Sequence, residues 1–140
     1  MTLSFATLDR VLLDENLDAL IAVSADVSPW QARHFQADLP EKWQHSFLVL
    51  APEPVGYVIM SRKESYWLHI HQFMVGAARR GQGVGAAMMA EAKRRAWADG
   101  SGLSLKVAHH DDAAIRFYLR EGFMRDRIEG DYLWMRRSSK

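Results

Sequence analysis

The spacing of hydrophobic residues changes near the middle of the chain, and each half predicts a different kind of structure. In the first half, short apolar runs rich in strand-forming residues alternate with polar or proline-containing turns, a pattern typical of β-strands. The runs that we interpret as strands are 3–6, 46–50, 55–60 and 66–75. Because short connections join the last three, they predict an antiparallel meander. The segments 14–24 and 30–38 are expected to be helical.

The second half begins with a helical pattern. Val84, Met88, Ala92 and Ala96 recur every four residues, which predicts a helix that ends at Gly100. The segments that follow are expected to form a strand over 103–108, a helix capped by Asp111 and ended by Gly122, and a hairpin of strands 123–128 and 132–136. Together the two halves predict an α/β fold, in which a mixed sheet carries helices on its faces.

Composition limits the class of protein. With 140 residues, 49% of them hydrophobic and 25% charged, the chain can form one domain over residues 1–140 with a substantial core. A net charge of +1 argues against an extended nucleic-acid-binding surface. The absence of cysteine excludes disulfides, thiol nucleophiles and cysteine-type zinc sites. There is neither a signal-peptide pattern nor a long apolar run, so we expect a cytoplasmic protein that does not bind membranes.

Glycines gather in the segment Arg79–Ala86, between the meander and the first helix of the second half. Gly81, Gly83 and Gly85 leave this turn almost free of side chains, so a ligand can approach the backbone N–H groups at the helix start. With two arginines beside it, the segment favours a bound phosphate group. A Walker-type loop is excluded because no Lys-Ser/Thr pair follows the last glycine. A dinucleotide-binding turn and a connector without a ligand remain alternative interpretations.

Two motifs in this order resemble the GCN5-related N-acetyltransferase (GNAT) family. The first, Arg80-x-x-Gly83-x-Gly85, is similar to the acyl-CoA-binding signature of that family. The second, the segment 111–123, resembles the family's late helix, in which Ala-Ile-x-Phe-Tyr and a Gly-Phe ending recur. One predicted helix and one predicted strand separate the motifs, as in the family. The resemblance implies an N-acetyltransferase that moves an acetyl group from its co-substrate acetyl-CoA to a primary amine.

The resemblance also implies which residues bind acetyl-CoA. The backbone of Phe73, Met74 and Val75 would pair with the pantetheine arm and acyl group, and Phe117 would pack beside the pantetheine end. The backbone N–H groups implied to hold the pyrophosphate are those of Arg80, Gly81, Gln82, Gly83, Val84, Gly85 and Ala86. Asp111 stands where the family often has an Asn that contacts pantetheine; an Asp can cap the helix but has no amide N–H to donate. Simple core packing is the alternative role for the apolar side chains.

Acetyl transfer to an amine needs a base for the proton of the amine and an acid for the departing thiolate. His69 and His71 are the candidate bases, because an imidazole with an ordinary pKa of about 6.5 accepts a proton near neutral pH. Strict alternation would put both on one face of the strand, together with Phe73 and Val75. The stretch 69–75 is also similar to the arylalkylamine N-acetyltransferase branch, in which a His-x-His relays the proton. A buried polar pair and a two-ligand metal site are the alternatives; because a third ligand is not evident, we predict no bound metal.

The candidate acid is Tyr118, because the family commonly has a Tyr at this point of the late helix, near the thioester sulfur. A neutral phenol can donate a proton to a developing thiolate, whereas a buried aromatic side chain is the structural alternative. The arginines that could meet the 3′-phosphate of CoA, or lie in solvent, are Arg79, Arg116 and Arg120.

The acceptor is expected to be a small-molecule amine or a peptide amine, bound near residues 26–45, where Trp30 and Trp43 are possible pocket residues. A different function is compatible with the same loop: a non-catalytic domain that binds acyl-CoA for regulation or sensing. In that case His69, His71 and Tyr118 would be incidental. Assembly as a homodimer is also compatible with the sequence.

Overall fold

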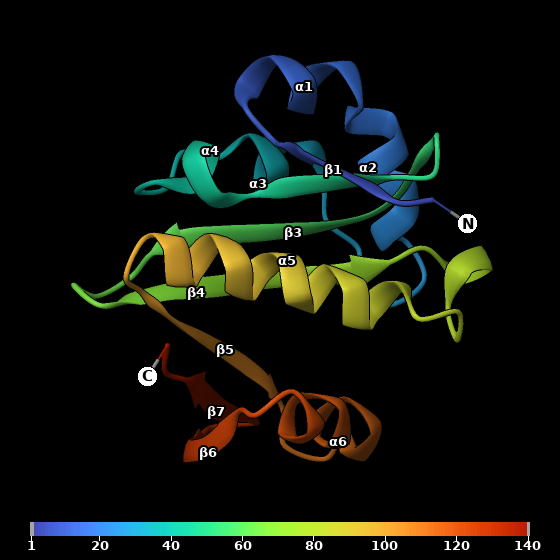
Figure 1. Cartoon of the computed structure of the whole chain (residues 1–140). Coiled ribbons are helices and arrows are strands. Elements are labelled where there is room, and N and C mark those ends of the chain that lie inside the picture. Colours follow the sequence, from blue (N-terminus) through green and yellow to red (C-terminus); the bar gives the residue numbers. More distant parts are fainter. Residues whose placement is uncertain (1, 140) are drawn as a thin grey trace.

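One mixed sheet with helices on both faces forms the structure, a computed structural model that describes residues 2–139 (Figure 1). The strands are β1 (Ser4–Thr7), β2 (Phe47–Leu50), β3 (Pro54–Arg62), β4 (Trp67–Val75), β5 (Gly102–Ala108), β6 (Met124–Glu129) and β7 (Tyr132–Arg137). The helices are α1 (Arg10–Glu15), α2 (Leu17–Ser24), α3 (Ala32–Gln36), α4 (Lys42–His45), η1 (Ala77–Arg79, a 3-10 helix), α5 (Val84–Ala98) and α6 (Asp112–Arg120). The predicted α/β fold is confirmed, with its antiparallel meander, central helix–strand–helix unit and C-terminal hairpin.

The strand order is β1-β2-β3-β4-β5-β7-β6, and β4 with β5 is the parallel pair in the described chain. Their pairing runs from Trp67 opposite Gly102 to Ile70 opposite Leu105 and then stops. Beyond that point the two strands diverge, and Figure 1 shows β5 turning away from β4 toward α6. The backbone of β4 after Ile70 therefore keeps β3 as a neighbour on one edge and has an open edge toward β5.

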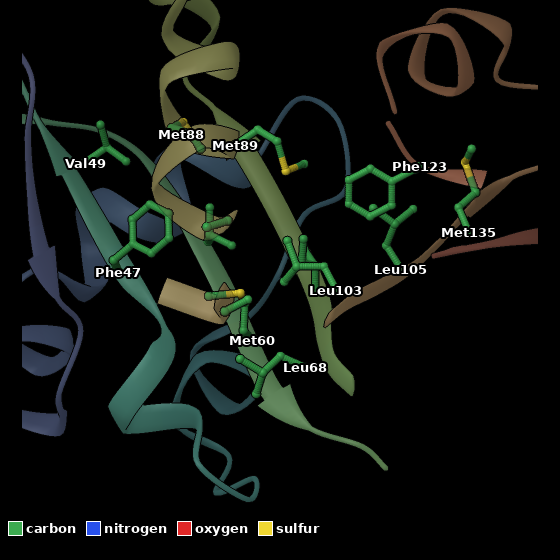
Figure 2. Close-up of a cluster of buried hydrophobic side chains, with 14 of the residues drawn as sticks. Phe47, Val49, Met60, Leu68, Met88, Met89, Leu103, Leu105, Phe123 and Met135 are labelled. Atoms are coloured by element: carbon green, nitrogen blue, oxygen red, sulfur yellow. The ribbon is translucent and has the colours of Figure 1, made fainter. Parts of the chain in front are cut away.

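Two hydrophobic clusters cover the opposite faces of the sheet. The first is packed around the buried side of α5, where Val84, Met88 and Ala92 meet residues from β2 to β5 and from β7; Figure 2 shows part of it. The second lies under α1, α2 and α3 and includes Phe35 and Tyr57. Because both faces of the central strands are buried, β3 is apolar over nearly its whole length, as expected of a strand between two helical layers.

A bulge in β4 changes which residues share a face. Gln72 pairs with Ile59 and Ile70 pairs with Met60, so His71 has no partner of its own in β3. Before the bulge, Leu68 and Ile70 lie in the cluster under α5; after it, Phe73 and Val75 do. The prediction that Phe73 and Val75 share a face with His69 and His71 is therefore wrong, because an extra residue reverses the alternation of a strand.

The N-terminal helices also differ from the sequence prediction. The helix expected over 14–24 is two helices that meet at Asn16, and the first begins earlier because the Asp9 side chain accepts a hydrogen bond from the Leu12 N–H (2.8 Å). The short helix α4 was not predicted. Its Lys42 is fully buried, and Nζ donates to the carbonyl oxygens of Phe35 (2.5 Å) and Ala37 (2.6 Å). These carbonyls lie at the C-terminal end of α3, where no further N–H group of the helix follows to donate to them.

Candidate active site

A cavity of about 380 Å³ opens where β4 and β5 diverge. Residues from β4, β5, α6, β7 and the segment between α2 and α3 line it. They are Val27, Ser28, Trp30, His69, Ile70, His71, Gln72, Phe73, Met74, Leu105, Lys106, Val107, Asp111, Ala114, Tyr118 and Tyr132. Both candidate bases and the candidate acid of the sequence prediction are thus brought to one cavity.

His69 and His71 lie against each other, with ring centroids 4.9 Å apart in an edge-to-face arrangement. Each is held by a serine of a neighbouring strand: His69 Nδ1 is 2.9 Å from Ser104 Oγ on β5, and His71 Nε2 is 2.6 Å from Ser61 Oγ on β3. The two serines fix the ring orientations. Sequence reasoning missed them, although a single serine within an apolar strand is a signal that a polar partner lies beside it.

The site lowers the basicity of both histidines. Burial lowers the pKa of His71 to about 4, and the nearby cations Lys63, Lys42 and Lys106 act in the same direction. Burial lowers the pKa of His69 to about 3, with His71, Lys63 and Lys106 adding to the effect. The ordinary pKa assumed from the sequence does not apply here, and both rings are neutral at neutral pH.

Tyr118 extends from α6 into a cluster of aromatic rings. Its ring centroid lies 5.4 Å from that of Phe117, 5.7 Å from that of Phe123 and 6.5 Å from that of Phe73. Burial raises the pKa of Tyr118 to about 12, and the negative charge of Asp111 acts in the same direction. The phenol is therefore protonated throughout the physiological range and is able to donate.

The glycine loop has the conformation that its sequence requires. Gly81 (φ 74°) and Gly83 (φ 82°) have left-handed backbones, and a Cβ at either position would meet no atom within 4 Å. Gly83 is the N-cap of α5, so the N–H groups of the first helical residues have no acceptor inside the helix. A second cavity, of about 470 Å³, lies over this helix start. Its lining residues are Val75, Arg79, Arg80, Gly81, Gly83, Gly85, Ala86, Phe117 and Arg120.

The polar side chains of the loop are already held in place. Arg80 pairs with Asp26, with Nη1–Oδ2 2.6 Å and Nη2–Oδ1 3.0 Å, and its Nε donates to the Val75 carbonyl (3.1 Å). Arg79 pairs with Glu53 (2.7 Å), and Gln82 Nε2 donates to the Ala78 carbonyl (3.1 Å). These contacts fix the loop from both sides.

The apolar residues predicted to bind the co-substrate connect the two cavities. Phe73 and Phe117 are in ring contact (5.8 Å), and a Cβ at Gly85 would lie 3.8 Å from the Phe117 ring. Met74 points to the opposite face of β4, into the cluster under α1 to α3. The Asp111 side chain accepts a hydrogen bond from the Ala114 N–H (3.2 Å), so its predicted capping role is confirmed.

Some side chains considered from the sequence for the acceptor or for CoA lie outside both cavities. Trp43 is outside the first cavity, where its Nε1 donates to Asp38 Oδ1 (2.6 Å). Arg116 lines a separate cavity between α6 and the C-terminal hairpin. Within residues 2–139, no third side chain completes a metal-binding group with His69 and His71.

Other described groups bear on a metal or a membrane. The three-residue group that could hold a metal ion is Glu41, His45 and Asp99, and the guanidinium of Arg62 contacts both of its carboxylates (3.0 and 2.5 Å). A cation of the chain itself is therefore already paired with both acids. None of the helices described is long and apolar enough to cross a membrane.

Comparison with solved structures gives matches over nearly the whole chain. Ard1 from Thermoplasma volcanium is 19% identical with a TM-score of 0.82, covering 98% of this chain and 97% of that one. The ribosomal-protein-S18-alanine N-acetyltransferase from Escherichia coli is 18% identical (TM-score 0.79; 96% and 92% covered). Naa50 from Arabidopsis thaliana, in complex with the bisubstrate analogue CoA-Ac-MVNAL, is 19% identical (TM-score 0.70; 97% of each chain covered). At these identities the matches establish the fold.

Comparison with family models establishes the family. No curated protein sequence matches the chain significantly. The model of the acetyltransferase (GNAT) family matches residues 12–123, which include the glycine loop, both histidines and the helix α6. This span is most of the chain and includes both motifs on which the resemblance rested. The chain therefore belongs to the GNAT family of N-acetyltransferases, enzymes whose co-substrate is acetyl-CoA.

Proposed function

We propose that this enzyme transfers an acetyl group from acetyl-CoA directly to a neutral primary amine, with His71 as base, assisted by His69, and Tyr118 as acid. The observation that carries the proposal is the cavity between β4 and β5, because it is lined by all three side chains. The acceptor would enter this cavity, and acetyl-CoA would lie along the open edge of β4.

The open edge and the glycine loop support this position of acetyl-CoA. Residues 73–75 of β4 have β3 on one side, so their other edge can pair with the amide groups of pantetheine as with another strand. The N–H groups of the loop from Arg80 to Ala86, at the positive end of the α5 dipole, would bind the pyrophosphate. Phe117 would pack beside the pantetheine end. Asp111 would act on the co-substrate site indirectly, by capping the start of α6, the helix that carries Phe117.

The reaction needs one bond to form and one to break. The amine nitrogen attacks the thioester carbonyl carbon, the new C–N bond replaces the C–S bond, and CoA leaves as a thiolate. The nitrogen becomes acidic as the bond forms, so a weakly basic His71 can then take its proton, while Tyr118 gives its proton to the thiolate. In the tautomer in which Nε2–H donates to Ser61 Oγ, the other ring nitrogen of His71, Nδ1, is left to accept the proton of the amine.

The low pKa of the histidines favours one class of amine. Alkyl amines, with pKa values near 10, are almost wholly protonated at pH 7, and a base with a pKa of about 4 does not deprotonate them. The α-amino group of a peptide, with a pKa of about 8, has roughly a tenth of its molecules neutral at pH 7. We therefore propose that the acceptor amine is the α-amine of a peptide, or a small-molecule amine that is neutral to a similar extent.

The test is release of CoA thiol by the purified chain. Acetyl-CoA should be consumed in the presence of peptides with free α-amines and more slowly with alkyl amines of similar size, at equal concentration and neutral pH. The His71→Ala variant should lose most of this rate while still binding acetyl-CoA. Binding of acetyl-CoA without turnover of any amine would contradict the proposal and favour a sensing domain.

A further inference from the structure

Two lysines without a carboxylate partner act on the histidines of the proposed acceptor cavity, and one of them lines it. Lys106 lines the cavity and is exposed, with Nζ 4.6 Å from the ring centre of Tyr132. Lys63 is also exposed, with Nζ 5.0 Å from the ring centre of Trp134. Neither Nζ has a carboxylate oxygen within 4.0 Å among residues 2–139. Both charges rest on aromatic rings and remain available to an anion.

The register of the sheet puts Lys106 on the same face as His69, and Lys63 reaches that region through its contact with Trp134. His69 lies opposite Ser104 on β5, so Lys106, two residues further along, is on that face as well. Trp134 of β7 lies opposite Lys106, and its ring is 5.2 Å from that of His69. Lys106 therefore stands directly beyond the histidine pair, at the point where β5 leaves β4.

The other charged groups of this region are already paired or face elsewhere. Arg127, which also lies over Trp134, is held by Asp126 (2.8 Å) and Glu129 (3.2 Å), and Arg136 lies 3.3 Å from Asp126. Among the residues that line the cavity, Asp111 is the carboxylate, and it caps α6. The free charge on the histidine side of the cavity is thus positive.

The positive charge of these lysines also acts on the histidines. Lys63 and Lys106 are among the groups that lower the pKa of both rings, after burial itself. The same field that opposes a proton on His71 opposes an ammonium group on an acceptor and attracts a carboxylate.

We propose, building on the function proposed above, that the acceptor carries a carboxylate close to its reacting amine and that Lys106, supported by Lys63, binds it. The long side chain of Lys106 can swing from Tyr132 toward the cavity while its charge stays in water. The carboxylate has two possible sources. It is either the α-carboxylate of a free amino acid or the side chain of an Asp or Glu near the N-terminus of a peptide, and diamines and polyamines are selected against.

The experiment compares acceptors that differ in one charge. Thiol release from acetyl-CoA is measured with peptides Ala-Glu-Ala-Ala, Ala-Gln-Ala-Ala and Ala-Lys-Ala-Ala, all amidated at the C-terminus, and with alanine against alaninamide, with rates corrected for the neutral fraction of each amine. A carboxylate should raise kcat/KM about five- to tenfold, the size of one charge-assisted contact at a partly exposed site. The Lys peptide should be the poorest acceptor. A preference confined to the peptide pair would identify a side-chain carboxylate, and one confined to the alanine pair an α-carboxylate.

The variants decide whether the lysines cause the preference. Lys106→Gln should remove most of it by lowering the rate with the acidic acceptor alone, and Lys106→Glu should reverse it; Lys63→Gln should reduce it. Lys93→Gln, on α5 across the sheet, should leave it unchanged. Equal rates with the Glu and Gln peptides and with both alanine acceptors, or a preference that survives Lys106→Gln, would overturn this inference and leave the acetyltransferase intact. Absence of turnover with every amine, despite acetyl-CoA binding, would overturn the proposed function and this inference with it.

Discussion

Arg80 and Asp26 form a two-point ion pair that ties the glycine loop to the segment between α2 and α3. The two groups come from distant parts of the chain and belong to different functions in our proposal. Arg80 lines the cavity over the start of α5, whereas the segment of Asp26 contributes Val27, Ser28 and Trp30 to the acceptor cavity. Loss of this pair should therefore change the affinity for acetyl-CoA more than that for the acceptor. The reason is that the Asp26 carboxylate and the pyrophosphate of acetyl-CoA would compete for the guanidinium of Arg80.

The first prediction concerns that competition. Asp26→Asn should tighten acetyl-CoA binding about two- to fivefold, the range of an exposed ion pair, since Arg80 no longer has to leave a carboxylate. Arg80→Ala should weaken binding instead. Calorimetric titration with acetyl-CoA at low and moderate salt measures both. Glu121→Gln, which removes the Lys93 ion pair between α5 and α6, serves as the control and should change affinity little. Weaker binding by Asp26→Asn would show that the pair supports the loop rather than competing with the ligand.

Much of the fold could be predicted because its signals are local. Three signals depend only on neighbours in sequence: the apolar runs between turns in the first half, the apolar residues at every fourth position of α5, and the cap at Asp111. The strands, α5 and α6 that they predict appear where expected, within a few residues at their ends. The two motifs that carry the family are local as well, so the glycine loop and α6 could be recognised without a structure.

The features that were missed depend on contacts between distant residues. The bulge at His71 is a feature of the pairing between β4 and β3, and the alternation of side chains along one strand cannot predict it. Burial of Lys42 contradicts the usual preference of lysine for the surface and is possible because two carbonyl oxygens accept hydrogen bonds from its Nζ. The low basicity of His71 likewise comes from burial and from lysines on three other segments.

A second prediction tests the acid. Tyr118→Phe should lower kcat about 100-fold, because the thiolate would leave without a proton donor, and should hardly change the KM for acetyl-CoA. Because the pKa of Tyr118 is raised to about 12, wild-type kcat should not fall between pH 8 and pH 10 through loss of this proton. Steady-state rates over that range measure both effects. Tyr66→Phe, whose hydroxyl lies near Ser139 (2.7 Å), should behave like the wild type. An unchanged kcat for Tyr118→Phe would remove Tyr118 from the mechanism.

Stability should depend on pH through the buried histidines. Their native pKa values, about 3 and about 4, lie below the unfolded value near 6.5, so the unfolded chain binds more protons between these limits. The resulting stability is complete above pH 6.5 and is lost as the pH falls toward about 4 for His71 and about 3 for His69, on the order of 1–2 kcal/mol per histidine at pH 5. Urea denaturation at pH 7.5, 6 and 5 measures it. His69→Gln should flatten this dependence; the same slope in the variant would contradict the assignment to His69.

The glycine loop allows a comparison between backbone strain and ligand binding. Gly83→Ala should cost about 1 kcal/mol of stability, because a Cβ disfavours the left-handed backbone (φ 82°), and should also weaken acetyl-CoA binding by disturbing the start of α5. Gly130→Ala is the matched control, since Gly130 is also left-handed (φ 59°) with open space around it, but it lies in the β6–β7 turn. Thermal denaturation and calorimetry should show a similar loss of stability in both and a loss of affinity in Gly83→Ala alone. Equal affinities for acetyl-CoA in the two variants would show that the glycine loop does not bind the co-substrate.

The last prediction concerns the position of the acceptor segment. The Tyr57 hydroxyl donates to Gln72 Oε1, and Gln72 Nε2 donates to the Ser28 carbonyl (2.9 Å), so a buried amide connects β3 through β4 to the wall of the acceptor cavity. Gln72→Leu removes both hydrogen bonds and leaves the Ser28 carbonyl without this donor, while the Tyr57 hydroxyl keeps its hydrogen bond with Ser24; the loss should cost about 2 kcal/mol of stability. The KM for the acceptor should rise several-fold while that for acetyl-CoA stays constant, because Val27, Ser28 and Trp30 line the acceptor cavity and not the cavity over the start of α5.

Tyr57→Phe separates the two effects, since it removes the hydroxyl that bonds Gln72 and Ser24 and leaves the bond from Gln72 to Ser28 in place. It should lower stability but change the acceptor KM less than Gln72→Leu does. Steady-state kinetics with each substrate varied in turn, together with urea denaturation, measure the split. An equal rise of both KM values in Gln72→Leu would contradict this prediction, because it would show that the Gln72 amide supports the whole fold. A displacement confined to residues 27–30 should leave the glycine loop in place, since the contact between them is the Asp26–Arg80 pair, which Gln72 does not touch.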